Sequence, residues 1–321
     1  MADVRIGLAL ENFSPYPKIP DIESLLAYSR RAEELGFDSL WVWDHILLGT
    51  KSPFPFLESL STLAAISTVT ERMSLGTGIL VLPLRNPVVL AKTTASLDRM
   101  SGGRLMLGVA AGWYEREFEA CGVSFKDRGK LFVRNLEVLN RFWTEDMVDG
   151  EYDGMAFRRA VMLPRPLQTP RPPLLIGGYV DRVLRRVARF ADGWLTYFYT
   201  PESFTEAWAK VRRFAEEEGR DPDSLLNVAQ LPFCVDTSLE SADRRVRSFI
   251  DSYFDVAPWS ESTADSAIRG TPEQCAEQLA RHVDAGVQHL VLVPCDYAPD
   301  QVEAIAEEIL PRFRRVEVLP S

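Results

Sequence analysis

One apolar stretch of the sequence ends in an acid and a histidine, and this pair carries the clearest chemical signal. Residues 41–45 read WVWDH, so that Asp44 and His45 follow directly after large apolar side chains. Imidazole both accepts and donates a proton near pH 7 without special tuning, which suits acid–base chemistry. We expect His45 to move a proton in catalysis, and Asp44 to cap backbone or to bind a ligand hydroxyl. The structural alternative is a strand-end histidine that only hydrogen-bonds a neighbouring loop.

Two stretches that contain small residues indicate room for a flat ligand. Residues 75–80 read LGTGIL. Glycine weakens a strand interior, so two glycines at a strand end suggest close approach by a ligand or an unusual backbone conformation. Residues 107–113 read LGVAAGW, where Gly112 leaves space and Trp113 can stack on a planar ring. Tight packing of a helix against a strand is the structural alternative for both stretches.

Two further stretches could hold an anion at the start of a helix. Residues 174–178 read LLIGG, and the backbone N–H groups of Gly177 and Gly178 would act there together with the helix dipole. This pattern is weak, because it is not the GxGxxG of dinucleotide-binding proteins. Residues 269–273 read RGTPE, which is first of all a helix start with a threonine N-cap and a proline in the first turn.

Missing motifs and the composition exclude several classes of function. The sequence has no Walker A loop, HExxH or GxSxG, and its four cysteines lack the spacing of a zinc site or a disulfide framework. Thirty-six basic and 46 acidic residues give a net charge of −10, with no long basic run to bind nucleic acid. No apolar run approaches the ~18 residues of a membrane helix, and the N-terminal residues do not resemble a signal peptide. We expect a cytoplasmic protein that binds a small-molecule substrate, with no nucleic acid, membrane or metal as partner.

The candidate residues lie within a repeating order of helix, turn and strand. An amphipathic helix over residues 25–35 is followed by Gly36, where a left-handed C-cap is wanted, and then by an apolar strand. The same order recurs over residues 97–110, 186–198 and 282–294. Strands that alternate with helices and read as continuous apolar runs predict a parallel sheet covered by helices.

The number of such units favours a closed (β/α)8 TIM barrel, formed by residues 1–321 as a single domain, over an open doubly wound sheet. In a barrel the C-terminal ends of the strands form the active-site face, and His45 would lie there. The predicted strands are Arg5–Leu10, Ser39–Trp43, Ser74–Ile79, Leu105–Val109, Leu174–Ile176, Trp194–Tyr197, Val228–Val235 and His289–Val293.

Insertions interrupt this order at three places. Residues 46–56 form a loop after the second strand, and residues 150–166 predict a β-hairpin with Gly154 near its turn. Residues 255–270 are polar and rich in serine, which indicates a flap. Loops after barrel strands line the active-site face, so the first and last of these insertions are candidate lids, with plain surface loops as the alternative.

Together these segments resemble the bacterial luciferase-like family of flavin- and F420-dependent oxidoreductases. No single piece is diagnostic, but their order and spacing over most of the chain are typical of the family. The resemblance is carried by RRAEELGFDSLWVWDH (30–45), ERMSLGTGILVLPLRNPVVLAK (71–92), LDRMSGGRLMLGVAAGWYEREFEACGV (97–123), MLPRP (162–166), LLIGGYVDRVLRRVARFADGW (174–194) and GTPEQCAEQLARHVDAGVQHLVL (270–292).

The resemblance implies a (β/α)8 barrel that holds FMN or the deazaflavin F420 at its C-terminal mouth. His45 matches a family histidine near the isoalloxazine ring, and Asp44 matches its neighbour. Gly78 and Ile79 match the site where members carry a non-prolyl cis peptide that bulges under the ring. Gly112 matches a position that contacts the flavin.

The same resemblance extends to the far end of the cofactor and to the substrate. Gly177 and Gly178 match the turn that approaches the cofactor's phosphate end. Members that oxidise sugar phosphates have a glutamate where this chain has Trp113, which puts that activity in doubt; Glu115 or Glu117 would need another geometry to replace it. Dimers are common in the family, which implies a homodimer through the helices after the second and third strands.

The strand end WVWDH is closer to the F420 branch of the family than to the luciferase branch, where an acid-His-His pattern is usual. We therefore expect an F420-dependent oxidoreductase that transfers a hydride between the deazaflavin and a small organic substrate, with His45 as proton donor or acceptor. The alternative is an FMN-dependent monooxygenase that uses reduced flavin and O2. A barrel without a redox cofactor is disfavoured, because it would need neither His45 nor the glycine-containing turn at residues 75–80.

Overall fold

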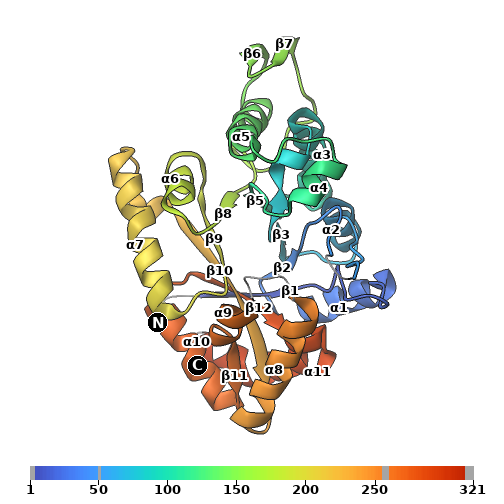
Figure 1. Cartoon of the computed structure of the whole chain (residues 1–321), viewed down its shortest axis with the longest axis vertical. Helices are drawn as coiled ribbons and strands as arrows, with labels where there is room; N and C mark the ends of the chain where they lie inside the picture. Colours follow the sequence, from blue (N-terminus) through green and yellow to red (C-terminus); the bar gives the residue numbers. More distant parts are fainter. Residues whose placement is uncertain (1–3, 50–51, 255–259, 315–321) are drawn as a thin grey trace, which may run out of the picture.

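Parallel strands close into an eight-stranded barrel in the computed structural model, which describes residues 4–49, 52–254 and 260–314 (Figure 1). The first strand pairs with both the second and the last, and β9 pairs with β10, so that the strands form a closed ring. The TIM barrel is confirmed and the open doubly wound sheet is wrong. The barrel strands are β1 (Arg5–Ala9), β2 (Ser39–Val42), β3 (Ser74–Thr77), β5 (Leu105–Ala110), β8 (Leu174–Gly177), β9 (Gly193–Tyr197), β10 (Leu226–Val235) and β12 (His289–Pro294).

Both faces of the barrel strands are buried, which explains why they read as unbroken apolar runs. In β2, Leu40 and Val42 belong to the hydrophobic cluster that the strands share with the helices. Trp41 and the following Trp43 belong instead to the cluster that fills the interior of the barrel. Successive strand residues point to opposite faces, so a strand buried on both sides is apolar at every position.

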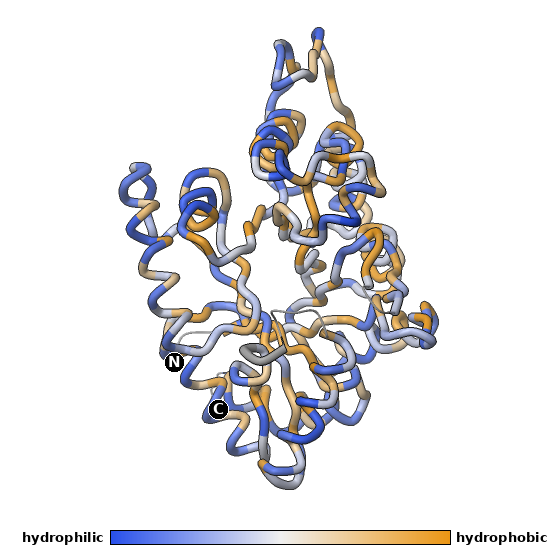
Figure 2. Tube along the Cα trace, viewed as in Figure 1, coloured by the Kyte–Doolittle hydropathy of each residue, from blue (hydrophilic) through white to orange (hydrophobic). Residues whose placement is uncertain are grey.

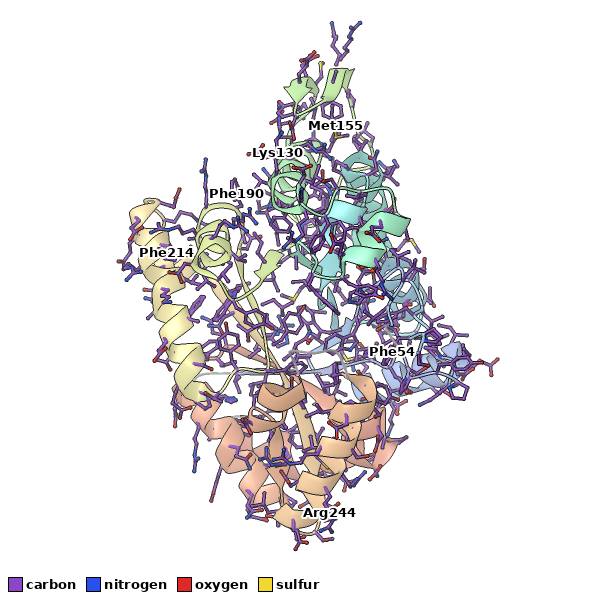
Figure 3. All side chains as sticks on the ribbon, viewed as in Figure 1. Phe54, Lys130, Met155, Phe190, Phe214 and Arg244 are labelled. Atoms are coloured by element: carbon purple, nitrogen blue, oxygen red, sulfur yellow. The ribbon has the colours of Figure 1, made fainter. Side chains whose placement is uncertain are left out.

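Helices cover the outside of the barrel (Figure 1) and alternate hydrophilic with hydrophobic residues (Figure 2), as expected for helices with one buried face. The helices α6 and α7 pack against each other, and Figure 3 labels Phe190 on α6 and Phe214 on α7. The Arg185 guanidinium of α6 lies 3.9 Å from the centre of the Phe214 ring. No helix in the described part of the chain is both long and apolar enough to span a membrane. The helices are α1 (Ile22–Glu34), α2 (Ser59–Ser67), α3 (Pro87–Met100), α4 (Glu115–Ala120), α5 (Arg128–Thr144), α6 (Asp181–Phe190), α7 (Pro201–Glu217), α8 (Leu239–Tyr253), α9 (Ser260–Asp265), α10 (Pro272–Asp284), α11 (Pro299–Ala304) and α12 (Leu310–Phe313).

Helix ends follow the signals in the sequence. Gly36 takes a left-handed conformation directly after α1, as predicted. At the start of α10, the side chain of Thr271 accepts from the backbone of Gln274, whose own side chain accepts from Thr271 in a capping box. The stretch RGTPE is therefore a helix start, which is the structural interpretation given above.

Shorter strands lie outside the barrel ring. β4 (Leu80–Val81) follows β3 closely and pairs with β5. β6 (Val148–Tyr152) and β7 (Met155–Ala160) form an antiparallel hairpin with Gly154 in its turn, and the hairpin projects beyond α5 (Figure 1). The hairpin expected within residues 150–166 therefore begins earlier, at residue 148.

The two loops expected to act as lids lie only partly within the described residues. Residues 50–51 of the 46–56 loop and residues 255–259 of the 255–270 segment are outside them. The rest of the second segment contains α9 and the short strand β11 (Ile268–Gly270), which pairs with β10 at the edge of the barrel.

Candidate active site

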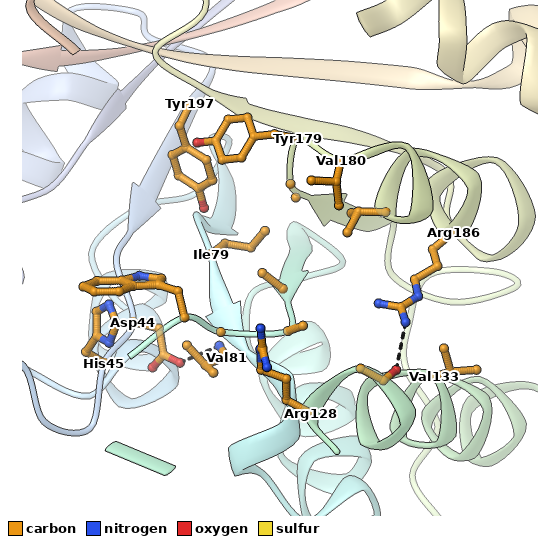
Figure 4. Close-up of a pocket in the computed structure, with 18 of the residues that line it drawn as sticks. Asp44, His45, Ile79, Val81, Arg128, Val133, Tyr179, Val180, Arg186 and Tyr197 are labelled. Carbon is orange, nitrogen blue, oxygen red and sulfur yellow. Dashed lines mark hydrogen bonds between the residues drawn. The ribbon is translucent and has the colours of Figure 1, made fainter. Parts of the chain in front are cut away.

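A cavity of about 1160 Å³ opens where the barrel strands end (Figure 4). Its wall comes from the segments that follow β2, β3, β5, β8 and β9, and from the helices α5, α6 and α8. Aromatic and aliphatic side chains supply much of this wall. Sites for drug-sized ligands occupy ~300–1000 Å³, so the cavity can hold a larger ligand or two smaller ones.

His45 lies on the cavity wall directly after β2, with 13% of its side chain exposed. Its Nδ1 is 3.0 Å from the carboxylate of Glu117. The edges of the imidazole also contact Phe56 and Trp113, with ring centroids 5.5 and 5.7 Å away. These contacts hold the ring in place, and Nε2 is the nitrogen that faces away from the carboxylate.

Glu117 was named from the sequence only, with Glu115, as a possible replacement for the family's acid, and its contact with His45 was not predicted. It lies in α4, which reads EREFEA, and its side chain is fully buried at 0% exposure. Only the packing of α4 decides which of the glutamates in this short helix turns inward, so no local pattern could find it. Its carboxylate points to His45 and not into the cavity, so it does not replace the acid that Trp113 displaces in the family pattern.

Asp44 is buried beside the cavity with its carboxylate used inside the protein. One oxygen accepts the backbone N–H of Val81 at 2.9 Å, and the other accepts from the Ser59 hydroxyl at 2.9 Å and from Arg85 at 2.7 Å. Burial raises the pKa of Asp44, and the positive charge of Arg85 opposes that shift. Of the two roles predicted for Asp44, backbone capping is therefore the one that the hydrogen bonds describe.

The turn after β3 contains the peptide bond between Gly78 and Ile79, and this bond is cis, as the resemblance implied. The Ile79 side chain lies on the cavity wall (Figure 4). Gly78 lies beneath the wall, where a Cβ atom would come within 2.0 Å of the amide nitrogen of Gln230 and 3.4 Å of the Trp41 ring. A residue larger than glycine at this position would therefore require the Gln230 side chain to move.

The end of β5 brings Gly112 and Trp113 to the same cavity. A Cβ atom on Gly112 would come within 2.6 Å of Val81 and 2.8 Å of Phe118, so a larger residue does not fit. Trp113 is 37% exposed and adds an aromatic wall next to His45. The geometry agrees with the predicted stacking surface at Trp113.

Gly177 and Gly178 line the cavity at the end of β8, just before α6. A Cβ atom on Gly177 would come within 2.4 Å of the Ile79 side chain. Gly178 has a φ of +142° that favours glycine, and its carbonyl accepts from the Trp194 indole at 3.1 Å. These two glycines let the β8 turn pack closely against the turn that carries Ile79.

Several positive side chains lie on the cavity wall, and they were not identified from the sequence. Figure 4 shows His45 at one end and Arg186 at the other, with Ile79 between them. Burial, and then the charge of Arg182 four residues earlier, lower the pKa of Arg186. Two arginines four residues apart on a helix repel each other, and a bound anion would relieve that repulsion. This spacing in the sequence could therefore have indicated an anion site. The described cavity wall contains the cations Lys126, Arg128, Lys130, Arg134, Arg182 and Arg186.

Acidic side chains on the same wall only partly balance this charge. Lys130, labelled at the start of α5 in Figure 3, pairs with Asp153 at 2.6 Å. Arg186 donates to the backbone carbonyl of Gly129 at 3.0 Å (Figure 4), and Arg128 donates to the carbonyl of Phe125 at 2.9 Å. Neutral carbonyls leave the positive charges of these arginines uncompensated, so this end of the cavity suits an anion.

The other two histidines lie away from the cavity, as expected of structural residues. His289 begins β12 and shares a hydrogen bond of 2.7 Å with the Ser39 hydroxyl, which also accepts from the Trp41 indole. His282 is buried in α10 with 4% exposure.

The fold and the site together describe a barrel with a large cavity at the C-terminal ends of its strands. A family model described as luciferase-like monooxygenase matches residues 5–289. The chain therefore belongs to the luciferase-like monooxygenase family, a family of oxidoreductases.

Known relatives include proteins with and without an assigned activity. The chain is 30% identical over 255 residues to an uncharacterised protein of Mycobacterium tuberculosis, a match that covers 74% of this chain and 88% of the relative. It is 28% identical over 350 residues to the F420-dependent glucose-6-phosphate dehydrogenase of Nocardia farcinica, with 98% and 99% of the two chains covered.

Solved structures share the fold at lower identity. An F420-dependent secondary alcohol dehydrogenase in complex with an F420-acetone adduct matches with a TM-score of 0.82 and 21% identity, over 98% of this chain and all of the other. The oxygenating constituent of a type II Baeyer–Villiger monooxygenase of Pseudomonas putida, in complex with FMN, matches with a TM-score of 0.79 and 17% identity, over 97% and 99%.

Proposed function

We propose that this protein is an F420-dependent oxidoreductase that transfers a hydride between the deazaflavin and a small organic substrate. The observation that carries the proposal is one elongated cavity with an imidazole at one end and a group of cations at the other. Relatives that match nearly the whole chain include F420-dependent glucose-6-phosphate dehydrogenases, which supports the choice of cofactor.

The residues present fit such a cofactor. Ile79, Val81 and Trp113 offer apolar and aromatic surface to a flat ring in the middle of the cavity, close to His45. The backbone at Gly177 and Gly178 and the side chains of α5 and α6 would hold the phosphate end. When bound, the deazaflavin supplies the carbon that gives or accepts the hydride.

The protein's own contribution is a proton, an orientation and a dry site. His45 gives or takes the proton that accompanies hydride transfer, since it lies on the cavity wall and an imidazole exchanges a proton near neutral pH. Asp44 holds the β4 backbone through the N–H of Val81, and so fixes the wall beside the ring. Trp43 and Trp113 exclude water around the imidazole.

The excess of cations is what favours F420 over FMN. FMN ends in a single phosphate, whereas F420 continues beyond its phosphate into a tail of glutamate carboxylates. A cavity whose wall contains Arg128, Arg182 and Arg186 can neutralise several negative charges. A single phosphate would leave part of this positive charge without a counter-ion.

The deciding experiment measures the affinity of the purified protein for F420, for FMN and for the deazaflavin without phosphate or tail, at low and high salt. We expect micromolar binding of F420 that weakens as salt rises, and much weaker binding of the other two. Tight FMN binding without F420 binding would favour the alternative, an FMN-dependent monooxygenase. Binding of none of them would contradict both cofactor assignments.

The substrate that we propose is uncharged and partly apolar, not a sugar phosphate. Phe13, Phe56, Tyr253 and Phe254 line the cavity on the side of β1 and α8, and the Phe13 and Phe56 rings stack with centroids 4.8 Å apart. The position at which sugar-phosphate dehydrogenases have an acid is occupied here by Trp113. Assays with small secondary alcohols and with glucose 6-phosphate would distinguish the two substrate classes.

We further propose a homodimer, formed through α2 and α3, in the cytoplasm. A second hollow lies between these helices, and Val89 and Met100 of α3 are 63% and 61% exposed beside it. The cysteines of the described chain are all free, as is usual in a reducing compartment. Light scattering should give the mass of a dimer for the wild type and a lower average mass for Val89→Glu, in which the dimer dissociates more readily. A wild type with the mass of a monomer would contradict the proposal.

A further inference from the structure

Glu117 binds a single segment of the chain, and this segment carries His45. Within the described residues, one carboxylate oxygen lies 3.0 Å from His45 Nδ1, and the other accepts from the backbone N–H of Ile46 and, at 3.2 Å, of Leu47. The side chain is 0% exposed and does not belong to the described cavity wall. Any influence of Glu117 on a ligand in the cavity must therefore pass through His45.

The hydrogen bond to Nδ1 decides which ring nitrogen of His45 can do chemistry. A carboxylate accepts hydrogen bonds and does not donate them. A neutral imidazole beside it carries its proton on Nδ1 and leaves Nε2 as a proton acceptor toward the cavity. When Nε2 gains a proton the ring becomes cationic, and a carboxylate in contact with it stabilises that charge.

We propose that Glu117 is a positioning residue that holds His45 in the Nδ1–H tautomer, so that Nε2 gives or takes the substrate proton. This proposal rests on the function proposed above for His45. For a substrate with a hydroxyl on the reacting carbon, the C–H bond breaks and its electron pair leaves with the hydrogen as hydride to the bound deazaflavin. The hydroxyl proton passes to Nε2, which leaves a carbonyl compound, the reduced coenzyme and an imidazolium beside Glu117. Reduction of a carbonyl compound follows the same path in reverse.

Glu117 also holds the start of the loop after β2, so the test needs a readout that a structural role would not change. Loop anchoring affects stability, whereas the tautomer of His45 depends on the partner of Nδ1. The nitrogen chemical shifts of a histidine ring report its tautomer directly in the protein without cofactor. The sequence contains only three histidines, so the spectrum is simple.

The first measurement is the tautomer of wild-type His45 by ¹⁵N NMR, with the signal assigned by its loss in His45→Gln. Burial lowers the pKa of His282 to about 4 and that of His289 to about 3, so both stay neutral at pH 6 to 8. We expect the neutral ring of His45 to carry its proton on Nδ1. A proton on Nε2 in the wild type would overturn the proposal without any variant at Glu117.

The second measurement compares Glu117→Gln with Glu33→Gln. A glutamine at 117 can keep its oxygen on the N–H groups of Ile46 and Leu47, which turns its NH2 group toward Nδ1. The His45 proton should then move to Nε2, and kcat/KM should fall by about 10²-fold or more, with an altered pH profile. Glu33 is the matched control, because it is another buried carboxylate that binds backbone N–H groups but contacts no histidine.

The outcomes separate this proposal from the proposed function. We expect Glu33→Gln to leave the His45 tautomer and turnover unchanged, even if it lowers stability. A Glu117→Gln protein that keeps the Nδ1–H tautomer, or that keeps wild-type turnover, would overturn the positioning role. If the tautomer changes as expected while the wild type turns over neither with F420 nor with FMN, the proposed function fails and the role of Glu117 in orienting His45 stands. If Glu117→Gln does not fold, the wild-type tautomer still decides.

Discussion

The two ends of the barrel contain similar carboxylates that do different work. At the N-terminal ends of the strands, Glu33 of α1 accepts the backbone N–H groups of Arg72 and Met73, just before β3, at 2.7 and 3.0 Å. At the C-terminal ends, Glu117 accepts backbone N–H groups just after β2 and also contacts an imidazole. The same device, a buried acid that ties a loop to a helix, becomes part of a chemical site only where a histidine separates it from a cavity.

Backbone hydrogen bonds stabilise the negative charge of Glu33 at the N-terminal end of the barrel. Burial alone would raise the pKa of Glu33, but the backbone N–H groups of Arg72, Met73 and Glu71 hold it below its usual range. Glu33 is thus a fixed charge whose hydrogen bonds are all made within the protein. The difference agrees with the general division of TIM barrels into a stabilising N-terminal face and a reactive C-terminal face.

The largest expected effect comes from replacing the histidine at each end of the barrel. His45→Gln should reduce kcat by about 10²-fold or more, because the proton donor is lost, and should leave cofactor affinity within a few fold. His289→Gln should keep kcat and lose about 1–3 kcal/mol of unfolding free energy, since its hydrogen bond with Ser39 is buried. The measurements are steady-state kinetics, cofactor titration and urea unfolding. Equal losses of kcat in both variants would remove the distinction between the two ends.

Most of the fold could be predicted from the sequence because it depends on local and repetitive patterns. Each barrel strand is buried on two faces and each helix on one, so their hydrophobic periods are strong and differ from each other. The end of α1 and the start of α10 could be predicted from Gly36 and Thr271, because capping residues are also local signals. Edges of insertions were less certain, as the hairpin that begins at residue 148 shows.

The candidate site was only partly predictable, because half of it depends on contacts between distant segments. His45 and the glycine turns follow predicted strands, and a closed barrel brings strand ends together. The contact of His45 with Glu117 spans 72 residues and depends on how α4 packs. The cations of α5 and α6 come together only at the cavity, so the spacing of Arg182 and Arg186 within α6 was the local signal that the sequence offered. The role of Asp44 was left open by the sequence, because its partner Arg85 lies 41 residues away.

A smaller effect should distinguish the arginines of α6 that line the cavity from an arginine of the same helix that does not. Arg182 and Arg186 line the cavity, whereas Arg189 of the same helix is exposed elsewhere, over the Phe190 ring. The double variant Arg182→Gln/Arg186→Gln should weaken F420 binding by about tenfold at low salt and by less at high salt, because charge-assisted contacts are lost. Arg189→Gln should bind as the wild type does. Fluorescence titration of F420 measures these affinities. Equal affinities for all three proteins would mean that Arg182 and Arg186 do not bind the anionic end of the cofactor.

The smallest expected effect concerns acid stability and the two histidines away from the cavity. Burial, and then the charge of Arg5, lower the pKa of His289 to about 3. Burial lowers the pKa of His282 to about 4, although Glu202 acts in the opposite direction. In the unfolded chain both rings titrate near 6.5, so between these values the unfolded state binds more protons than the folded state. Their contribution to stability is therefore complete above about pH 6.5 and is lost as the pH falls from there toward 4 and 3.

His282→Leu tests this contribution at a site where, within the described structure, neither ring nitrogen has a hydrogen-bond partner. Near pH 5 the variant should reduce the slope of unfolding free energy against pH by about one proton, which is ~1.4 kcal/mol per pH unit. At pH 7.5 its stability should be close to that of the wild type, because no hydrogen bond is removed. Urea unfolding of both proteins at pH 7.5, 6 and 5 gives the two slopes. An unchanged slope would mean that His282 titrates in the folded protein as it does in water, and would contradict the effect of burial on its pKa.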